Sequence, residues 1–483
     1  MHNSKLIQVL KTFSKKEIKQ FREFTQSPFF NKNKSVISLL DVLIKFYPEF
    51  QDKNLDAKNV FKIIFPDEEY DYFKIRNLSS DLLAVSMEFL KIIFFQKNEH
   101  QNTLYLLEQL RDRDLDKMFQ KLFDVYYQKI KSNHVRDEFY YSNMADLKNE
   151  LKSFYSPKRP NSDFNLIQEQ LDYELTHFLI KALDLYTIML HEIKQNNYEF
   201  KLEMFDEVLI YLEKNKDNIA PVLKMFYLII MLHKENDDRS FYELKDHGKK
   251  IFDSLGFYEK YMYFLHMTGF CAERYNTDCS TDFMKEHFYL SKDNLETDTI
   301  VMGKIMYLDF VNHVKVAARV NEFDWAEKYI TRFKDQLNEE KESTLNFSYG
   351  YIEYMKGNRL KALELLSQTN FPNFIIKIQV KILILQISYE ESFYDQAIAM
   401  IDSFRHFLAR ENSVRENYKE SFYDYMRITG ELIRLKTSVK KKDLRSDLKR
   451  LKDAAEKSTQ NQFGIKLWLF KMIDNFDLKK TGI

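Results

Sequence analysis

Four residues with zinc-ligand side chains stand close together in the sequence: His266, Cys271, Cys279 and His287. Imidazole and thiolate groups are the usual ligands of structural zinc. Their spacings of 5, 8 and 8 residues match no compact zinc module, because ligand pairs in such modules are about two to four residues apart. We therefore expect a buried Cys271 on a helix and an exposed Cys279 in a turn, and predict no metal.

Other catalytic patterns are incomplete. Glu174 and His177 form one Glu-x-x-His unit, which di-iron bundles use twice, and no second copy is placed to complete it. His191-Glu192 lacks the second histidine of a zinc-protease motif. The sequence contains no Gly-x-Ser-x-Gly, no Gly-x-Gly-x-x-Gly and no phosphate loop. We predict that the protein is not an enzyme and has no cofactor.

Two basic stretches are the strongest binding signals. Residues 1–34 have a local balance of +6, and residues 434–452 have a balance of +7. Phosphate backbones or acidic proteins would be attracted to either stretch, although lysine-rich helix faces are commonly only solvated. In the second stretch Leu444, Leu448 and Leu451 form an apolar stripe that could dock the helix on its neighbours. The candidate basic residues are Lys15, Lys16, Lys19, Arg22, Lys441, Arg445 and Lys449.

The composition predicts an all-α protein. The 483 residues include only 9 Gly and 7 Pro, while 45% are hydrophobic and 30% are charged. Lys plus Arg and Asp plus Glu both number 73, so net charge favours neither a nucleic acid nor a membrane. Two cysteines, no export signal and no long apolar run indicate a cytoplasmic protein without a membrane segment. The oligomeric state is not indicated.

Helix signals divide the chain into four parts. Ser14 and Glu17 form a capping box, flanked by Phe13 and Ile18 as a hydrophobic staple. Asp56 is placed to open another helix, and a long amphipathic helix follows. Residues 1–97 are thus expected to form a bundle of about four helices. Connecting helices over 98–155 break near 112–114 and 133–134, and the proline-rich residues 156–163 form the expected boundary.

The rest of the chain reads as helix pairs. Residues 164–411 form the predicted array of helix hairpins, with turns at 235–238, 276–278, 321–322, 357–358 and 391–392. Helix pairs at intervals in the mid-thirties are typical of a solenoid, in which neighbouring pairs complete each other's core. Residues 412–483 are expected to be capping helices.

Three consecutive pairs share a small residue in the second helix. Ala326, Ala362 and Ala397 are 36 and 35 residues apart, and the middle pair also has Gly350 seven residues before Gly357. Over about 297–411 the chain resembles tetratricopeptide repeats, in which small residues occupy the close helix crossing. The usual first-helix tryptophan and closing proline are absent. Larger residues replace the second small residue, at Phe333, Thr369 and Phe404.

A second resemblance concerns the N-terminus. The stretch Phe13-Ser14-Lys15-Lys16-Glu17, followed by Ser27-Pro28-Phe29-Phe30-Asn31, is similar to the start of uncharacterised bacterial proteins of the Bacteroidota. This similarity implies no activity.

The repeat resemblance implies a non-enzymatic intracellular scaffold or adaptor that binds a protein or peptide in the groove of the array. The expected partner-binding residues, on the first helices, are Asn346, Tyr349, Glu353 and Lys381. The alternative is a regulatory protein whose basic N-terminal bundle binds nucleic acid while the array senses a partner or ligand.

Overall fold

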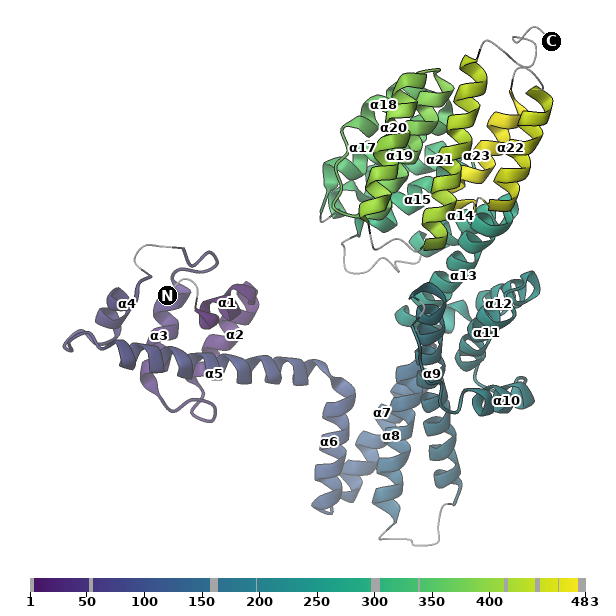
Figure 1. The fold of residues 1–483 in the computed structure, drawn as a ribbon. Coiled ribbons are helices and arrows are strands. Elements are labelled where there is room, and N and C mark those ends of the chain that lie inside the picture. The colour runs from purple at the N-terminus through teal and green to yellow at the C-terminus, as the bar shows by residue number, and fades with distance from the viewer. Residues whose placement is uncertain are drawn as a thin grey trace. The chain divides into compact units, whose positions relative to one another are not determined.

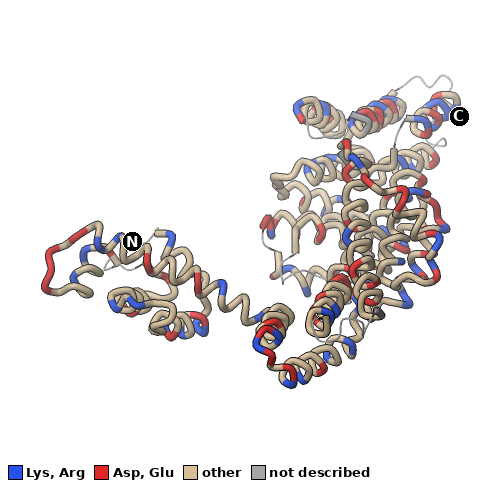
Figure 2. The backbone as a smooth tube through the Cα atoms, turned by 90° about the horizontal axis from the view of Figure 1, so that it is seen from below, with Lys and Arg blue, Asp and Glu red and all other residues tan. Residues whose placement is uncertain are grey.

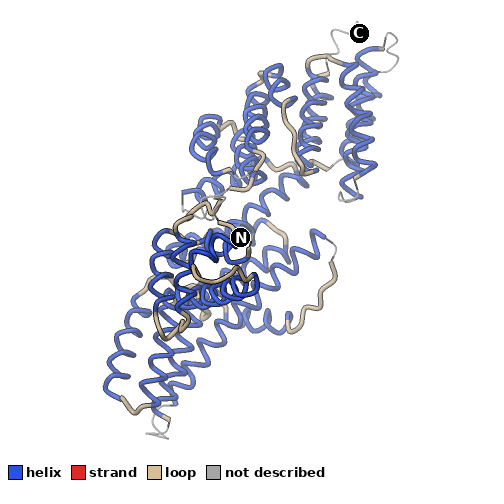
Figure 3. Tube along the Cα trace, turned by 90° about the vertical axis from the view of Figure 1, so that its left-hand side faces the viewer, coloured by secondary structure: helices blue, strands red, loops and turns tan. Residues whose placement is uncertain are grey.

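The protein is built from α-helices. A computed structural model describes residues 4–51, 55–156, 164–196, 198–296, 305–337, 339–411, 416–438, 444–458 and 460–476. These residues form 23 α-helices and no β-strand (Figures 1 and 3). The predicted all-α class is therefore confirmed. None of the helices in these ranges is long and apolar enough to span a membrane.

The chain divides into two compact units. The first unit comprises Met1–Asn133 and Tyr141–Glu174, and the second comprises His134–Tyr140 and Leu175–Ile483. The helices that begin before residue 160 are α1 (Lys5–Thr12), α2 (Lys15–Gln26), α3 (Lys34–Ile44), α4 (Ala57–Ile64), α5 (Tyr72–Lys97), α6 (Glu99–Asp112), α7 (Asp116–Ser132) and α8 (Glu138–Tyr155).

Local capping sets the N-terminal helices. The predicted capping box is present: Ser14 N donates to the Glu17 carboxylate at 2.8 Å, and Glu17 N donates to Ser14 Oγ at 3.2 Å. Phe13 and Ile18 are buried, and the Asp56 carboxylate caps α4. The described residues up to Lys97 form five helices, close to the expected number of about four. The first of them, α1, is capped by Ser4, and its Leu6, Ile7 and Leu10 are buried.

Helices α6 to α8 enclose a small aromatic core. Phe119 of α7 stacks on Phe154 of α8 with ring centroids 4.0 Å apart. The predicted breaks are confirmed, since α6 ends at Asp112 and α7 ends at Ser132. Of the predicted boundary 156–163, residues 157–163 lie outside the described residues.

From α10 onward, each of the remaining helices contacts the next helix along the chain. They are α9 (Phe164–Asn196), α10 (Phe205–Asn215), α11 (Pro221–Glu235), α12 (Asp238–Ile251), α13 (Phe257–Asp278), α14 (Thr281–Glu296), α15 (Tyr307–Arg319), α16 (Phe323–Phe333), α17 (Lys341–Lys356), α18 (Arg359–Ser367), α19 (Phe374–Glu390), α20 (Tyr394–Arg410), α21 (Glu416–Thr437), α22 (Leu444–Ser458) and α23 (Ile465–Asp474).

One predicted turn is wrong. Residues 276–278 belong to the last turn of α13, which continues to Asp278. The break falls at Cys279, whose φ of 57° places it in the left-handed region and ends the helix. Cys279 is half-buried, not exposed as predicted, whereas Cys271 is buried on α13 as expected.

Helix pairs pack closely at the predicted small residues. Ala326, Ala362 and Ala397 are completely buried. A Cβ atom on Gly350 would lie 3.1 Å from Leu366 Cγ and 3.4 Å from the Ala362 carbonyl oxygen, so α17 and α18 cross closely and a side chain here would press on α18. Figure 2 shows acidic and basic residues interspersed along the backbone. The second unit is thus a helical array in which neighbouring helices contact one another.

Candidate partner-binding face

The spacing of the three alanines relates positions on the first helices of three pairs. The same spacings of 36 and 35 residues make Lys315 of α15, Tyr351 of α17 and Gln386 of α19 equivalent positions. All three are buried or nearly so. We call the equivalent positions on this side of the three helices the inner face. Its members are Leu308, Val311, Lys315, Ala318, Arg319, Thr344, Phe347, Tyr351, Tyr354, Met355, Gln379, Ile382, Gln386, Tyr389 and Glu390.

Two basic side chains of α15 lie on the inner face with neutral partners: Lys315 is buried and Arg319 is half-buried. Lys315 Nζ donates to Gln379 Oε1 at 2.6 Å and to Asn312 Oδ1 at 3.0 Å. Burial, together with the nearby Arg319 charge, holds the pKa of Lys315 well below its usual value.

Arg319 lies between two tyrosines. Its Nε donates to the Tyr351 hydroxyl at 2.8 Å, and its guanidinium carbon lies 4.8 Å from the centre of the Tyr275 ring. In the part of the chain that the structure describes, neither Arg319 nor Lys315 has a carboxylate partner within ion-pair distance. This side of α15 therefore places two basic groups without carboxylate partners beside amide and phenol groups.

A segment near the C-terminus contacts the inner face at several points. We call Asn461–Asp474 the C-terminal segment; it comprises the 3-10 helix Gln462–Gly464 and α23. Asn461 Nδ2 donates to the Tyr275 carbonyl oxygen at 2.9 Å, and Asn461 N donates to the Asn276 carbonyl oxygen at 3.0 Å. The ring of Phe463 lies 5.8 Å from Lys315 Nζ. The segment therefore contacts both α13 and α15.

Glu390 joins the other end of the segment to α19. Its carboxylate accepts from Trp468 Nε1 at 2.7 Å and from the Tyr354 hydroxyl at 2.9 Å, and it also pairs with Arg359. The Trp468 ring lies edge-on to Tyr389, with centroids 5.4 Å apart. Burial and the adjacent Glu390 charge raise the pKa of Tyr354 well above its usual value.

The predicted partner-binding residues lie elsewhere on these helices. Asn346, Tyr349 and Glu353 follow one another at intervals of three and four residues, on the side of α17 opposite Tyr351. Asn346 and Glu353 are half-buried, and Tyr349 is 37% exposed. The Glu353 carboxylate accepts from Asn358 at 2.7 Å and from Lys361 at 2.9 Å, and these contacts lower its pKa.

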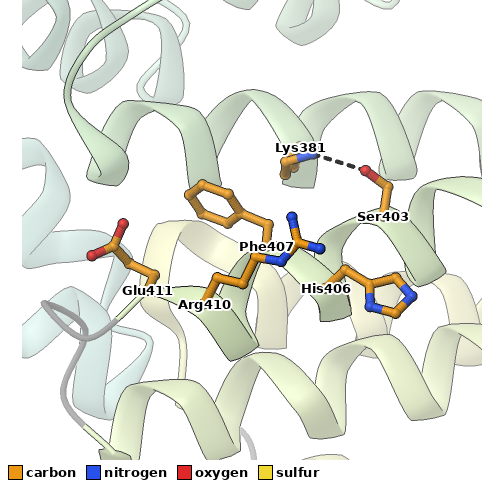
Figure 4. A pocket seen from close by; sticks show the side chains of 6 residues that line it. All are labelled: Lys381, Ser403, His406, Phe407, Arg410 and Glu411. Atoms are coloured by element: carbon orange, nitrogen blue, oxygen red, sulfur yellow. Dashed lines mark hydrogen bonds between the residues drawn. The ribbon is translucent and has the colours of Figure 1, made fainter.

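Lys381 lines a pocket between α19 and α20. The pocket has a volume of about 380 Å³. Lys381 Nζ donates to Ser403 Oγ at 3.1 Å, and burial lowers the Lys381 pKa. Figure 4 shows this bond together with the other lining side chains, which come from α20 and the residue after it: His406, Phe407, Arg410 and Glu411.

The basic residues differ in their surroundings. Lys15, Lys16 and Lys19 are exposed on α2, whereas Arg22 Nε pairs with Asp41 at 2.7 Å. Arg445 and Lys449 are exposed on α22, whose Leu444 and Leu451 are buried as the predicted stripe requires. Lys441 lies outside the described residues.

The histidines and cysteines considered as zinc ligands do not converge. His266 Nδ1 shares a hydrogen bond of 2.9 Å with His233 Nε2 of α11, and His287 is buried on α14. His177 Nε2 pairs with the Glu138 carboxylate at 3.0 Å. Within the described ranges, no group of three or more histidine, cysteine or acidic residues is arranged to hold a metal ion.

Comparisons with known proteins add no relative. No family model matches the sequence, and no similar curated protein or solved structure was found. The arguments about function therefore depend on the array and its inner face.

Sequence reasoning missed the inner face, although a signal for it was present. The alanine spacing that aligned the second helices also aligns Lys315, Tyr351 and Gln386 on the first helices. Applied to the first helices, it would have selected these residues in place of Asn346 and Lys381, which are themselves 35 residues apart.

Proposed function

We propose that the protein is a non-enzymatic scaffold of the tetratricopeptide-repeat type that binds a protein partner through its helical array. One observation supports this most directly: inner-face residues of α15 and α19 contact the C-terminal segment through side chains, and the contact of Trp468 with Glu390 is the most specific. A surface that binds one amphipathic helix in this way is suited to bind another. A cytoplasmic location is part of the proposal.

The test is purification of the full chain from its native cells at low and high salt. A protein recovered at fixed stoichiometry in both conditions supports the proposal. Two variants then locate the binding surface. Tyr389→Phe removes a buried inner-face hydroxyl that has no hydrogen-bond partner among the described residues, so it should spare the fold. Tyr349→Ala alters the exposed side of α17.

Loss of the partner in Tyr389→Phe would assign binding to the inner face, and loss in Tyr349→Ala would assign it to the opposite side of α17. Recovery of no protein partner from either condition would contradict the proposal.

The second candidate is nucleic-acid binding by the N-terminal helices. Its support is that Lys15, Lys16 and Lys19 are all exposed on α2. If this function holds, nucleic acid should be bound by the full chain at low salt and released at high salt. Replacing the three lysines with glutamine should then weaken binding and flatten its salt dependence, whereas Lys471→Gln, an exposed change on α23, should not.

A further inference from the structure

The chemistry of the inner face differs from that of an ordinary core. Its residues include a lysine, an arginine, a glutamate, two glutamines and three tyrosines, all wholly or largely covered. Buried charges are costly unless an opposite charge compensates them. Lys315 and Arg319 have only amide and phenol partners in the described part of the chain, and the Tyr389 hydroxyl has none. Permanent burial of these groups would be costly, so we expect the inner face to be exposed to solvent part of the time.

The segment that contacts this face is short. Helix α23 has 10 residues, fewer than the roughly 12–15 that an isolated helix needs for marginal stability in water. Ile465, Leu469 and Ile473 are buried together with residues of α19 to α22, and the helices that α23 contacts most are α21 and α22. The helical form of α23 therefore depends on its docking.

The contacts of the segment are those of a bound amphipathic helix. Its buried residues Ile465, Trp468, Leu469 and Ile473 share one side, and Leu467, Phe470 and Met472 on the flanks are half-buried. The indole N–H reaches Glu390, and Asn461 fixes the start of the segment against the backbone of α13. These interactions join residues far apart in the sequence; Asn461 and Tyr275, for instance, are separated by 186 positions.

We propose that the C-terminal segment is an internal competitor: it occupies the inner face and limits binding of a partner that presents an amphipathic helix with an aromatic side chain in the place of Trp468. This inference rests on the proposed function. Because the segment is tethered to the array, its effective concentration is on the order of millimolar, so a free helix of equal intrinsic affinity competes poorly. Weakening the segment should uncover the inner face.

The probe is a labelled synthetic peptide of residues 460–476, added to three full-length proteins. These are the wild type, a double variant with Trp468→Ala and Leu469→Ala, and the control Lys471→Ala, which changes an exposed residue of the same helix. The peptide should bind the double variant at least tenfold more tightly than it binds the wild type or the control. Equal affinity for all three proteins, or no binding to a double variant that retains its helical circular dichroism, would overturn the proposal.

Hydrogen exchange on the unmodified full chain gives a second test that needs no substitution. Amides of α23 should exchange through local opening, at least tenfold faster than those of α17 and α19. Equal protection of all three helices would show that the segment is a permanent part of the core, and would overturn the proposal even if the double variant did not fold.

The results also separate this inference from the proposed function. If a native protein partner is purified but the peptide binds all three proteins equally, the scaffold function stands and the segment is not a competitor. A peptide effect without any native partner would show that the segment can be displaced from the array, and would remove both the scaffold function and the role of the segment as a competitor.

Discussion

The indole N–H of Trp468 donates a 2.7 Å hydrogen bond to the carboxylate of Glu390, 78 residues earlier in the chain. Glu390 also accepts from Tyr354 and pairs with Arg359, so its carboxylate links α17, α18, α19 and α23. The indole of Trp468 is almost completely buried. The contact is thus the best single point at which to test how strongly the C-terminal segment is held.

Trp468→Phe should lower the free energy of unfolding by about 1.5–3 kcal/mol, because a hydrogen bond to a charged acceptor is lost from a buried site. Urea denaturation monitored by circular dichroism measures this change. The matched control is Trp325→Phe, which removes an indole that stacks on Tyr329 in α16, and it should cost less. Equal losses in the two variants would assign the effect to ring size instead of to the Glu390 bond.

The crossing of α17 and α18 gives a second prediction. Gly350→Ala should destabilise the protein by about 1–2 kcal/mol, because its Cβ would press against Leu366 and the Ala362 carbonyl oxygen. Gly269→Ala, inside α13, should stabilise it by about 0.5–1 kcal/mol, since a Cβ there meets no atom within 4 Å. The melting temperatures of the two variants test this prediction. Melting temperatures that shift in the same direction would contradict a close crossing of α17 and α18.

Ala362→Trp tests the same crossing more severely. An indole has no room at a completely buried position between two helices, so the variant should lose more than about 3 kcal/mol and loosen the neighbouring pairs. Leu360→Trp is the control, because Leu360 is 60% exposed on the same helix. An unchanged melting temperature for Ala362→Trp would show that the helix pairs do not pack through this residue.

Features that depend on a few neighbouring residues could be predicted from the sequence. The capping box of Ser14 and Glu17 satisfies backbone groups within one turn, and the burial of Ala326 follows from helical spacing. Cys279 shows the limit of local signals: asparagine and aspartate at 276 and 278 suggested a turn, but the helix continues to Asp278.

Contacts between distant segments could not be predicted in this way. Nothing near Asn461 in the sequence indicates that its side chain meets Tyr275, and the pairing of His233 with His266 depends on how α11 packs against α13. The inner face was not considered as a candidate site for the same reason. The helix that contains Tyr349 and Tyr351 was predicted. Which side of this helix is buried depends on contacts with segments far away in the sequence.

Two buried histidines predict how stability depends on pH. Burial, reinforced by the nearby His233 and His191 for His266, and by His313, Arg319 and Lys315 for His287, lowers the pKa of each from 6.5 to about 3. Below pH 6.5 the unfolded chain gains a proton at each site, while the folded chain stays neutral until about pH 3. Stability is therefore lost as the pH falls through this window, by about 1.4 kcal/mol per histidine at about pH 5.5.

The free energy of unfolding should be measured by urea denaturation at about pH 7.5 and about pH 5.5 for the wild type, His266→Gln and His287→Gln. Each variant should show a loss between the two pH values that is smaller than the wild-type loss by about 1.4 kcal/mol, because one titrating site is gone. His406→Gln, an exposed change on α20, should leave the wild-type loss unaltered. If His266→Gln and His406→Gln give the same pH dependence, His266 does not stay neutral in the folded protein across this range.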